Sequence, residues 1–168
     1  MEISILALPL IASIISGFFG KFIGDRNSEI LTSLLVSISA IFSVIVLYEV
    51  IINQYQENII IATWIDSGSL NVNWSMKIDP LSAVMLVVVT SVSSLVHIYS
   101  IGYMSHDPHK PRFMAYLSLF TFAMLMLVTS DNFIQLFFGW EGVGLCSYFL
   151  IGFWFKKDTA NAAAIKAF

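Results

Sequence analysis

Charged side chains are scarce in this sequence. Asp, Glu, Lys and Arg make up 11% of its 168 residues, whereas hydrophobic residues make up 58%, and the mean hydropathy is +0.84. The few charges fall in short clusters between long apolar runs, which is not the pattern of a soluble domain or of a basic nucleic-acid-binding surface. We therefore expect a protein embedded in a lipid bilayer, with no nucleic-acid partner.

Cysteine and the usual cofactor motifs are also lacking. The single cysteine, Cys146, lies in an apolar segment, so it excludes an internal disulfide and is expected to act as a small buried hydrophobe. The sequence contains no CxxC, GxGxxG or Walker motif. His106, Asp107 and His109 share one polar loop, but their spacing is not specific for a metal. We predict no cofactor and no metal in this chain.

Five apolar runs are long enough to cross a bilayer as helices. The first follows Met1-Glu2 and not a basic stretch, so it predicts a retained anchor and no cleaved signal peptide. A sixth helix begins at Ala160 and stops at Phe168, which suggests a piece of a longer chain. The five predicted segments are Ile3–Gly20, Ile30–Ile52, Pro80–Tyr103, Phe113–Thr129 and the helix within Asp131–Phe155.

Residues 59–78 differ from these runs and predict a β-hairpin. Polar and apolar residues alternate over Asn71–Ile78, after a turn at Asp66–Ser69. An open sheet edge cannot face lipid, so the hairpin must lie outside the hydrocarbon, where Trp64 and Trp74 would suit the membrane interface. The fold class is therefore an all-α polytopic membrane protein with one extramembrane hairpin.

Basic residues predict how the chain is oriented. In an alternating chain, the loops after segments one, three and five fall on the same side of the membrane. These loops contain Lys21 and Arg26, Lys110 and Arg112, and Lys156 and Lys157. The opposite side carries only Lys77. By the positive-inside rule, the basic loops lie in the cytoplasm or matrix, and the amino terminus and the hairpin lie outside.

Glu141 is the main candidate for a functional residue. At a rise of 1.5 Å per residue it lies about 15 Å from Asp131 and about 22 Å from Lys156, close to mid-membrane. An acidic side chain there costs roughly 2.5–3.5 kcal/mol, which favours a role in proton or ion transfer. Gly139, Gly142 and Cys146 form a stripe that would let a neighbouring helix supply a counter-charge or water. The alternative is a hydrogen-bonded structural tie.

Two further residues are weaker candidates. His97 lies within the third segment and could relay protons, although a lone membrane histidine is more often a hydrogen-bonded packing residue. Lys166 lies on the incipient sixth helix, either within the membrane or snorkelling to its surface.

Several sequence blocks resemble one known family. They are Asp79–Ser82, Leu95–Met104, Arg112–Leu117 and Ser130–Trp154, the last containing GWEGVGLCSYFLIGFW. Together they resemble the amino-terminal part of the chain 5 or L subunits of NADH:ubiquinone oxidoreductase, respiratory complex I, which are related to cation/proton antiporter subunits. The resemblance implies that Glu141 belongs to a proton channel and pairs with a lysine on the seventh helix, beyond Phe168.

The same resemblance implies an organisation and a setting. Residues 1–168 would be the amino-terminal part of one antiporter-like domain: two helices in 1–58, the hairpin in 59–79, and helices three to five with the start of six in 80–168. Other membrane-arm subunits would be partners, and flavin and iron–sulfur clusters would sit in further subunits. The membrane would be the bacterial inner membrane or the mitochondrial inner membrane. Two alternatives stay open: the large subunit of a cation/proton antiporter, and a non-transporting membrane scaffold.

Overall fold

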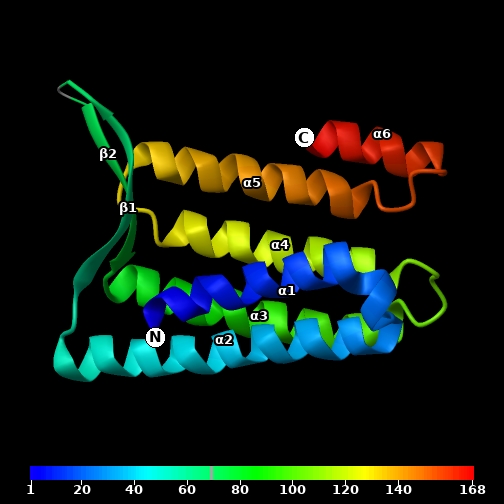
Figure 1. Ribbon diagram of the computed structural model, residues 1–168, viewed down its shortest axis with the longest axis horizontal. Helices are drawn as coiled ribbons and strands as arrows, with labels where there is room; N and C mark the ends of the chain where they lie inside the picture. Colours follow the sequence, from blue (N-terminus) through cyan, green and yellow to red (C-terminus); the bar gives the residue numbers. More distant parts are fainter. Residues whose placement is uncertain (69) are drawn as a thin grey trace.

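The computed structural model describes residues 1–68 and 70–168, which form a helical bundle with a hairpin across one end (Figure 1). Five of the helices in these residues are long and apolar enough to cross a membrane, as predicted. The helices are α1 (Glu2–Ile23), α2 (Asp25–Asn53), α3 (Pro80–Tyr103), α4 (Lys110–Val128), α5 (Phe133–Ile151) and α6 (Asp158–Ala167). The strands are β1 (Glu57–Ser67) and β2 (Leu70–Ile78).

Local capping chemistry sets the start of α3. The Asp79 carboxylate accepts the Ser82 backbone N–H at 2.8 Å, and the Ser82 hydroxyl accepts the Asp79 N–H at 2.8 Å. This reciprocal pair is a capping box, and Pro80 follows it in the first turn, where its missing N–H costs nothing. The helix therefore has the predicted bounds, Pro80–Tyr103.

The start of α2 differs from the prediction. The apolar run suggested a helix from Ile30, but the helix already begins at Asp25, directly after Gly24 with φ +87°. Glycine adopts this left-handed conformation without strain, so the chain reverses there in a single residue. Ser28 and Glu29, assigned to a loop from their polarity, are buried in the first turns of α2.

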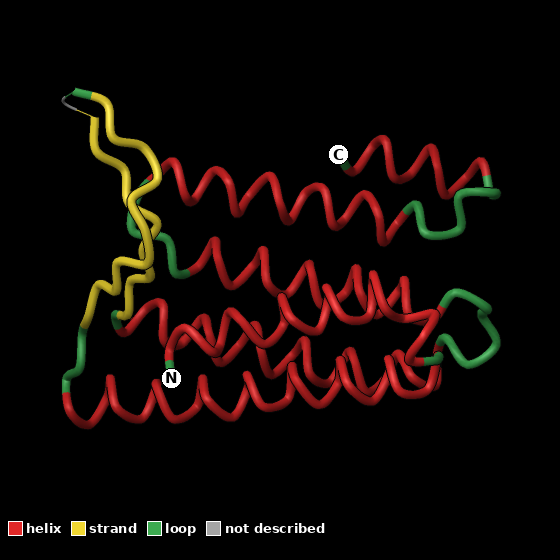
Figure 2. The backbone as a smooth tube through the Cα atoms, viewed as in Figure 1, coloured by secondary structure: helices red, strands yellow, loops and turns green. Residues whose placement is uncertain are grey.

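Small residues bring the first four helices into close contact. The Ser39 hydroxyl of α2 donates to the Ile5 carbonyl of α1 at 2.7 Å, and Ser37 of α2 lies 2.7 Å from Ser94 of α3. A Cβ added at Gly17 of α1 would lie 3.5 Å from that of Ala115 on α4. Small side chains at these positions let the neighbouring helices approach closely. In the bundle, α5 lies between α4 on one side and α6 on the other (Figure 2).

The predicted hairpin is present and covers the end of the bundle. Its strands pair antiparallel from Glu57 opposite Ile78 to Ser67 opposite Leu70, with irregularities after Ile60 and Thr63. Met76 and Ile78 point into the helical core, and the Lys77 N–H donates to the Thr129 carbonyl at the end of α4. Ser69, part of the predicted turn, lies outside the described residues. The hairpin therefore caps the helices and does not line their apolar sides.

The connections sort to the two ends of the bundle as predicted. The α1–α2, α3–α4 and α5–α6 connections lie at the end opposite the hairpin, and six of the basic residues lie in these connections or within three residues of them: Lys21, Arg26, Lys110, Arg112, Lys156 and Lys157. The amino terminus lies on the hairpin side (Figure 1). Successive long helices of the bundle therefore run in opposite directions, as expected for a chain that crosses a membrane repeatedly.

Candidate functional site

Glu141 lies near the middle of α5, on a side of the helix that no other described element covers. It is about 12 Å along the axis from Phe133 and about 15 Å from Ile151. Its side chain is exposed, as are those of the neighbouring Trp140 and Leu145. Within the described part of the chain, no ion pair involves Glu141.

The glycines of the predicted stripe face α4. A Cβ added at Gly139 would come 2.8 Å from the Cα of Leu127, and one added at Gly142 would come 3.2 Å from the Cβ of Ala123. Cys146, on the same stripe, is buried, as expected. The stripe therefore does bring a neighbouring helix close, and that helix is α4.

The close contact with α4 turns Glu141 away from that helix. At about 100° per residue, Glu141 is rotated about 200° from Gly139 and about 100° from Gly142. The cations of α4, Lys110 and Arg112, stand in its first turn at the opposite end of the helix from the hairpin. The helix brought close by the glycines thus supplies no counter-charge at the depth of Glu141.

Gln135 fixes the position of α5 along its axis, a role that was not predicted from the sequence. Its side chain is buried and forms two bonds with the backbone of Ser75 in β2: Oε1 accepts the N–H at 3.0 Å, and Nε2 donates to the carbonyl at 2.6 Å. The Asn132 side chain caps α5 by accepting the Gln135 N–H at 2.9 Å. The sequence does contain a signal for this role of Gln135. It is an amide side chain within an otherwise apolar run, and a buried amide needs hydrogen-bond partners.

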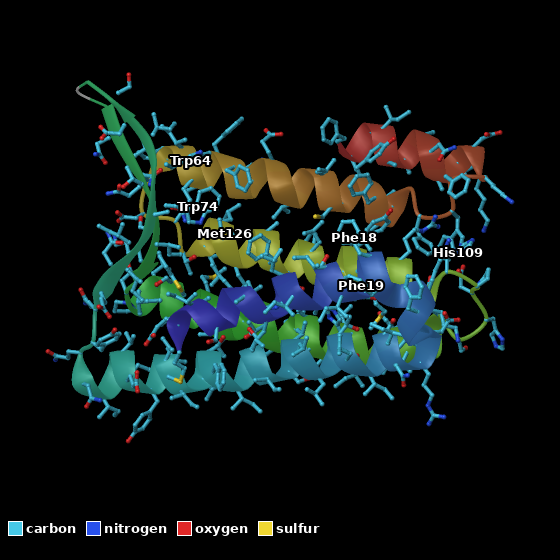
Figure 3. The ribbon with its side chains drawn as sticks, viewed as in Figure 1. Phe18, Phe19, Trp64, Trp74, His109 and Met126 are labelled. Atoms are coloured by element: carbon cyan, nitrogen blue, oxygen red, sulfur yellow. The ribbon has the colours of Figure 1, made fainter. Side chains whose placement is uncertain are left out.

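The hairpin and α5 are also joined by an aromatic cluster. Trp64 of β1, Trp74 of β2 and Phe138 of α5 meet edge to face, with ring centroids 4.8–5.8 Å apart. Both tryptophans lie where the hairpin meets the start of α5 (Figure 3). Phe138 is three residues before Glu141, so this cluster and Gln135 together hold the helix that carries the acid.

His97 is buried between α3 and α4. Its Nδ1 lies 2.7 Å from the Ser93 carbonyl, and its Nε2 lies 3.0 Å from the Ser118 hydroxyl of α4. Because a carbonyl can only accept, Nδ1 carries a hydrogen, and in the neutral ring Nε2 accepts from Ser118. The Ser93 hydroxyl lies 2.5 Å from that of Thr121, which extends the polar contacts between the two helices.

Lys166 lies in the last turn of α6 with an exposed side chain. Its helix returns along α5 from the basic end, and Ala164 packs near Gly152. No ion pair joins Lys166 to Glu141 within residues 1–68 and 70–168. The three predicted site residues are therefore not brought together: His97 faces the α3–α4 contact, while Glu141 and Lys166 are exposed on α5 and α6.

The loop residues considered for a metal have other partners. The Asp107 carboxylate accepts the His109 N–H at 2.8 Å and the Trp154 Nε1–H at 3.0 Å. Among the described residues, no three His, Cys, Asp or Glu side chains are grouped to hold a metal ion.

Five long apolar helices in the described residues, with a hairpin across one end of the bundle, define a polytopic membrane protein. Two family models match: complex I chain 5 N-terminus over residues 64–114, and the NADH:quinone oxidoreductase/Mrp antiporter transmembrane model over residues 130–168. The chain belongs to this family of complex I chain 5 and subunit L proteins, over the part of them that it spans.

Individual relatives agree with the family models. The chain is 58% identical over 167 residues to NADH-ubiquinone oxidoreductase chain 5 of Marchantia polymorpha, covering 99% of this chain and 25% of the relative. It is 51% identical over 168 residues to NADH-quinone oxidoreductase subunit L of Rickettsia felis, covering 100% of this chain and 26% of the relative. The chain thus spans about a quarter of the length of these relatives.

A solved structure confirms the fold. The chain superposes with a TM-score of 0.79 on a chain of the membrane-bound sulfane sulfur reductase, an archaeal respiratory membrane complex. The match covers 99% of this chain and 33% of that one at 18% sequence identity. At this identity the similarity concerns the fold of an integral membrane subunit.

Proposed function

We propose that this chain forms part of a proton-translocating membrane subunit of respiratory complex I, and that Glu141 takes up and releases a proton there. The observation that carries the proposal is the placement of one carboxylate at mid-helix on the uncovered side of α5. An acid in that position is costly in lipid, so it requires a partner or a water-filled path on that side. Residues 1–168 would be the amino-terminal part of one antiporter-like domain.

The uncovered face of α5 supports a partner outside these residues. Of the five long helices in the described residues, α5 is the least buried, and it exposes large side chains beside Glu141. The proposed counter-charge is a lysine on a later helix of the full-length chain, packed against this face.

The test compares two substitutions in the full-length protein within its membrane assembly. Glu141→Gln removes the titratable group with little change in shape, and Glu49→Gln makes the same change at the hairpin end of α2. In sealed vesicles, we expect NADH-driven proton translocation to be lost with Glu141→Gln and kept with Glu49→Gln. Unchanged translocation by a normally assembled Glu141→Gln protein would refute the role.

A second candidate function is the large subunit of a cation/proton antiporter, because the model that matches residues 130–168 is shared with Mrp antiporters. The two candidates differ in their partners. A complex I subunit should co-purify with subunits that carry flavin and iron–sulfur clusters, whereas an antiporter subunit should not. A non-transporting scaffold is separated from both by the proton-flux measurement.

His97 and Lys166 are proposed to have secondary roles. Both ring nitrogens of His97 have partners within α3 and α4, which supports a packing role, and a proton relay is the alternative. Lys166 is proposed as an accessory charge in the last turn of α6, a helix that returns along α5 from the basic end.

The proposed setting follows from the same reasoning. The chain would sit in a bacterial or mitochondrial inner membrane beside other membrane-arm subunits, with its basic connections in the cytoplasm or matrix. Electron transfer from NADH to quinone would take place in subunits that carry the flavin and iron–sulfur cofactors. This chain would hold no redox group and would contribute to the enzyme by moving protons.

A further inference from the structure

A cluster of cations surrounds a cavity at the end of the bundle opposite the hairpin. The cavity measures about 240 Å³ and lies between the α3–α4 connection and the α5–α6 connection. His109 lies at this end of the molecule (Figure 3). At roughly 30 Å³ per water molecule, the cavity has room for a phosphate group together with part of its ester substituents. Its charged lining residues are Asp107, Arg112, Lys156 and Lys157.

Arg112 lines this cavity, and part of its guanidinium has no partner among the described residues. Its Nη2 donates to the Phe153 carbonyl at 3.2 Å, and its guanidinium lies 4.6 Å from the centre of the Phe153 ring. Its Nε atom is buried and has no hydrogen-bond partner among the described residues. A guanidinium carries five N–H donors, and Phe153 accepts only one hydrogen bond from this one, so N–H groups of Arg112 remain for an acceptor in the cavity.

The only carboxylate in the lining is occupied elsewhere. Asp107 accepts hydrogen bonds from the His109 N–H and the Trp154 indole, and no ion pair within 4.0 Å joins it to Arg112 in the part of the chain described. Three cationic side chains thus face the cavity against one carboxylate that is already bonded. An anion would balance this excess of positive charge.

Trp154 indicates the kind of anion. Its indole is held by Asp107, and Lys157 Nζ lies 5.2 Å from the centre of its ring. Tryptophan is typical of the level at which lipid headgroups meet hydrocarbon, and basic pockets between membrane helices on one face bind anionic headgroups. Phe155, which is exposed, also lines the cavity and offers an apolar surface to acyl chains.

We propose that this cavity binds the phosphate of one anionic phospholipid. Arg112 donates to the phosphate from the start of α4, Lys156 and Lys157 hold it from the α5–α6 connection, and Trp154 contacts the glycerol region. The bound lipid ties the α5–α6 connection to the start of α4. This site is separate from Glu141, so the proposal does not depend on proton translocation.

The test uses the full-length protein in its membrane assembly and a photoactivatable phosphatidylglycerol. We expect the probe to crosslink to residues 107–112 and 153–157. Lys156→Gln with Lys157→Gln should lower the affinity for the probe by about fivefold for each cation removed, and Arg112→Gln by at least as much. Arg26→Gln, which removes an exposed cation at the same end of the bundle, should change nothing.

Three outcomes would overturn the proposal. Equal labelling by a phosphatidylcholine probe with the same acyl chains would show that the anionic headgroup is not recognised. Displacement of the lipid probe by millimolar inorganic phosphate would indicate a site for a free anion. Loss of labelling with Arg112→Gln but not with the double lysine variant would indicate a packing defect, because Arg112 also bonds Phe153.

Discussion

Gly139 of α5 lies directly against the backbone of Leu127 of α4. A Cβ at Gly139 would come within 2.9 Å of the backbone N and Cβ of Leu127 and within 2.8 Å of its Cα, closer than real Cβ contacts. Backbone atoms cannot move aside as a flexible side chain can, so the two helices must separate if residue 139 grows. The spacing of α4 and α5, and with it the rotation of Glu141 away from α4, depends on this glycine.

The first prediction concerns that contact. Gly139→Ala should destabilise the α4–α5 pair by about 1–3 kcal/mol, as overpacking of a tight contact does. Gly102→Ala, near the end of α3, is the control, since nothing lies within 4 Å of a Cβ at that position. The measurement is the thermal midpoint of the assembled protein in detergent. Equal midpoints for the two variants would show that the close approach is not needed.

The second prediction concerns the attachment of the hairpin to α5. Gln135→Ala leaves the buried N–H and carbonyl groups of Ser75 without their hydrogen-bond partners. Each unpaired group should lower the free energy of unfolding by about 1–3 kcal/mol. We expect faster hydrogen exchange at the Ser75 amide. Gln56→Ala, at an exposed glutamine, should leave that exchange unaltered. If Gln135→Ala also leaves it unaltered, the side chain does not hold the hairpin.

The third prediction concerns pH and the cap of α3. The Ser82 backbone N–H lowers the pKa of Asp79 below its ordinary value of 3.8, against a smaller opposing effect of burial, and the Ser82 side chain and Lys77 add to the lowering. The stabilisation by the charged cap is therefore complete above pH 3.8 and lost as the pH falls through the lowered value. Asp79→Asn keeps a cap acceptor that does not titrate.

Hydrogen exchange in the first turn of α3 measures this effect. Protection of these amides in the wild type, relative to Asp79→Asn, should fall as the solution is acidified below pH 3.8. A ratio that stays constant with pH would contradict the role of the charged form of Asp79.

The fourth prediction separates the two roles of His97. The Asn side chain of His97→Asn can still donate to the Ser93 carbonyl, and the Gln side chain of His97→Gln can still reach the Ser118 hydroxyl. Neither amide can take up and release a proton as an imidazole can. With a packing role, His97→Asn and His97→Gln should assemble and keep proton translocation. His97→Ala should be destabilised, because the buried Ser118 loses its partner. Loss of translocation in a normally assembled Asn or Gln variant would establish the relay instead.

The elements of this fold could be predicted where short-range chemistry defines them. Asp79 and Pro80 give the start of α3, and the alternation over Asn71–Ile78 gives the second strand of the hairpin. The polarity of Ser28 and Glu29 was misleading, because a helix end can bury polar residues against neighbouring helices. Sequence periodicity contains no information about such neighbours.

The depth of Glu141 within its helix could be predicted from the sequence, but the direction in which its side chain points could not. The position of Glu141 within an apolar run marks it as unusual, and the glycine stripe indicates a close helix. That this helix is α4, and that the acid faces the other way, depends on contacts between distant parts of the chain. The attachment of Gln135 to Ser75 is equally long-range, with 60 residues between the partners.

The most direct test of the central claim observes the proton on Glu141 itself. Infrared difference spectra of the assembled protein, recorded between resting and NADH-driven states, report the carbonyl stretch of protonated carboxyl groups. Our account predicts a carboxyl band that changes with turnover, disappears with Glu141→Gln and persists with Glu49→Gln. Identical difference bands in the wild type and the Glu141→Gln protein would contradict the assignment of Glu141 as a proton-transfer group.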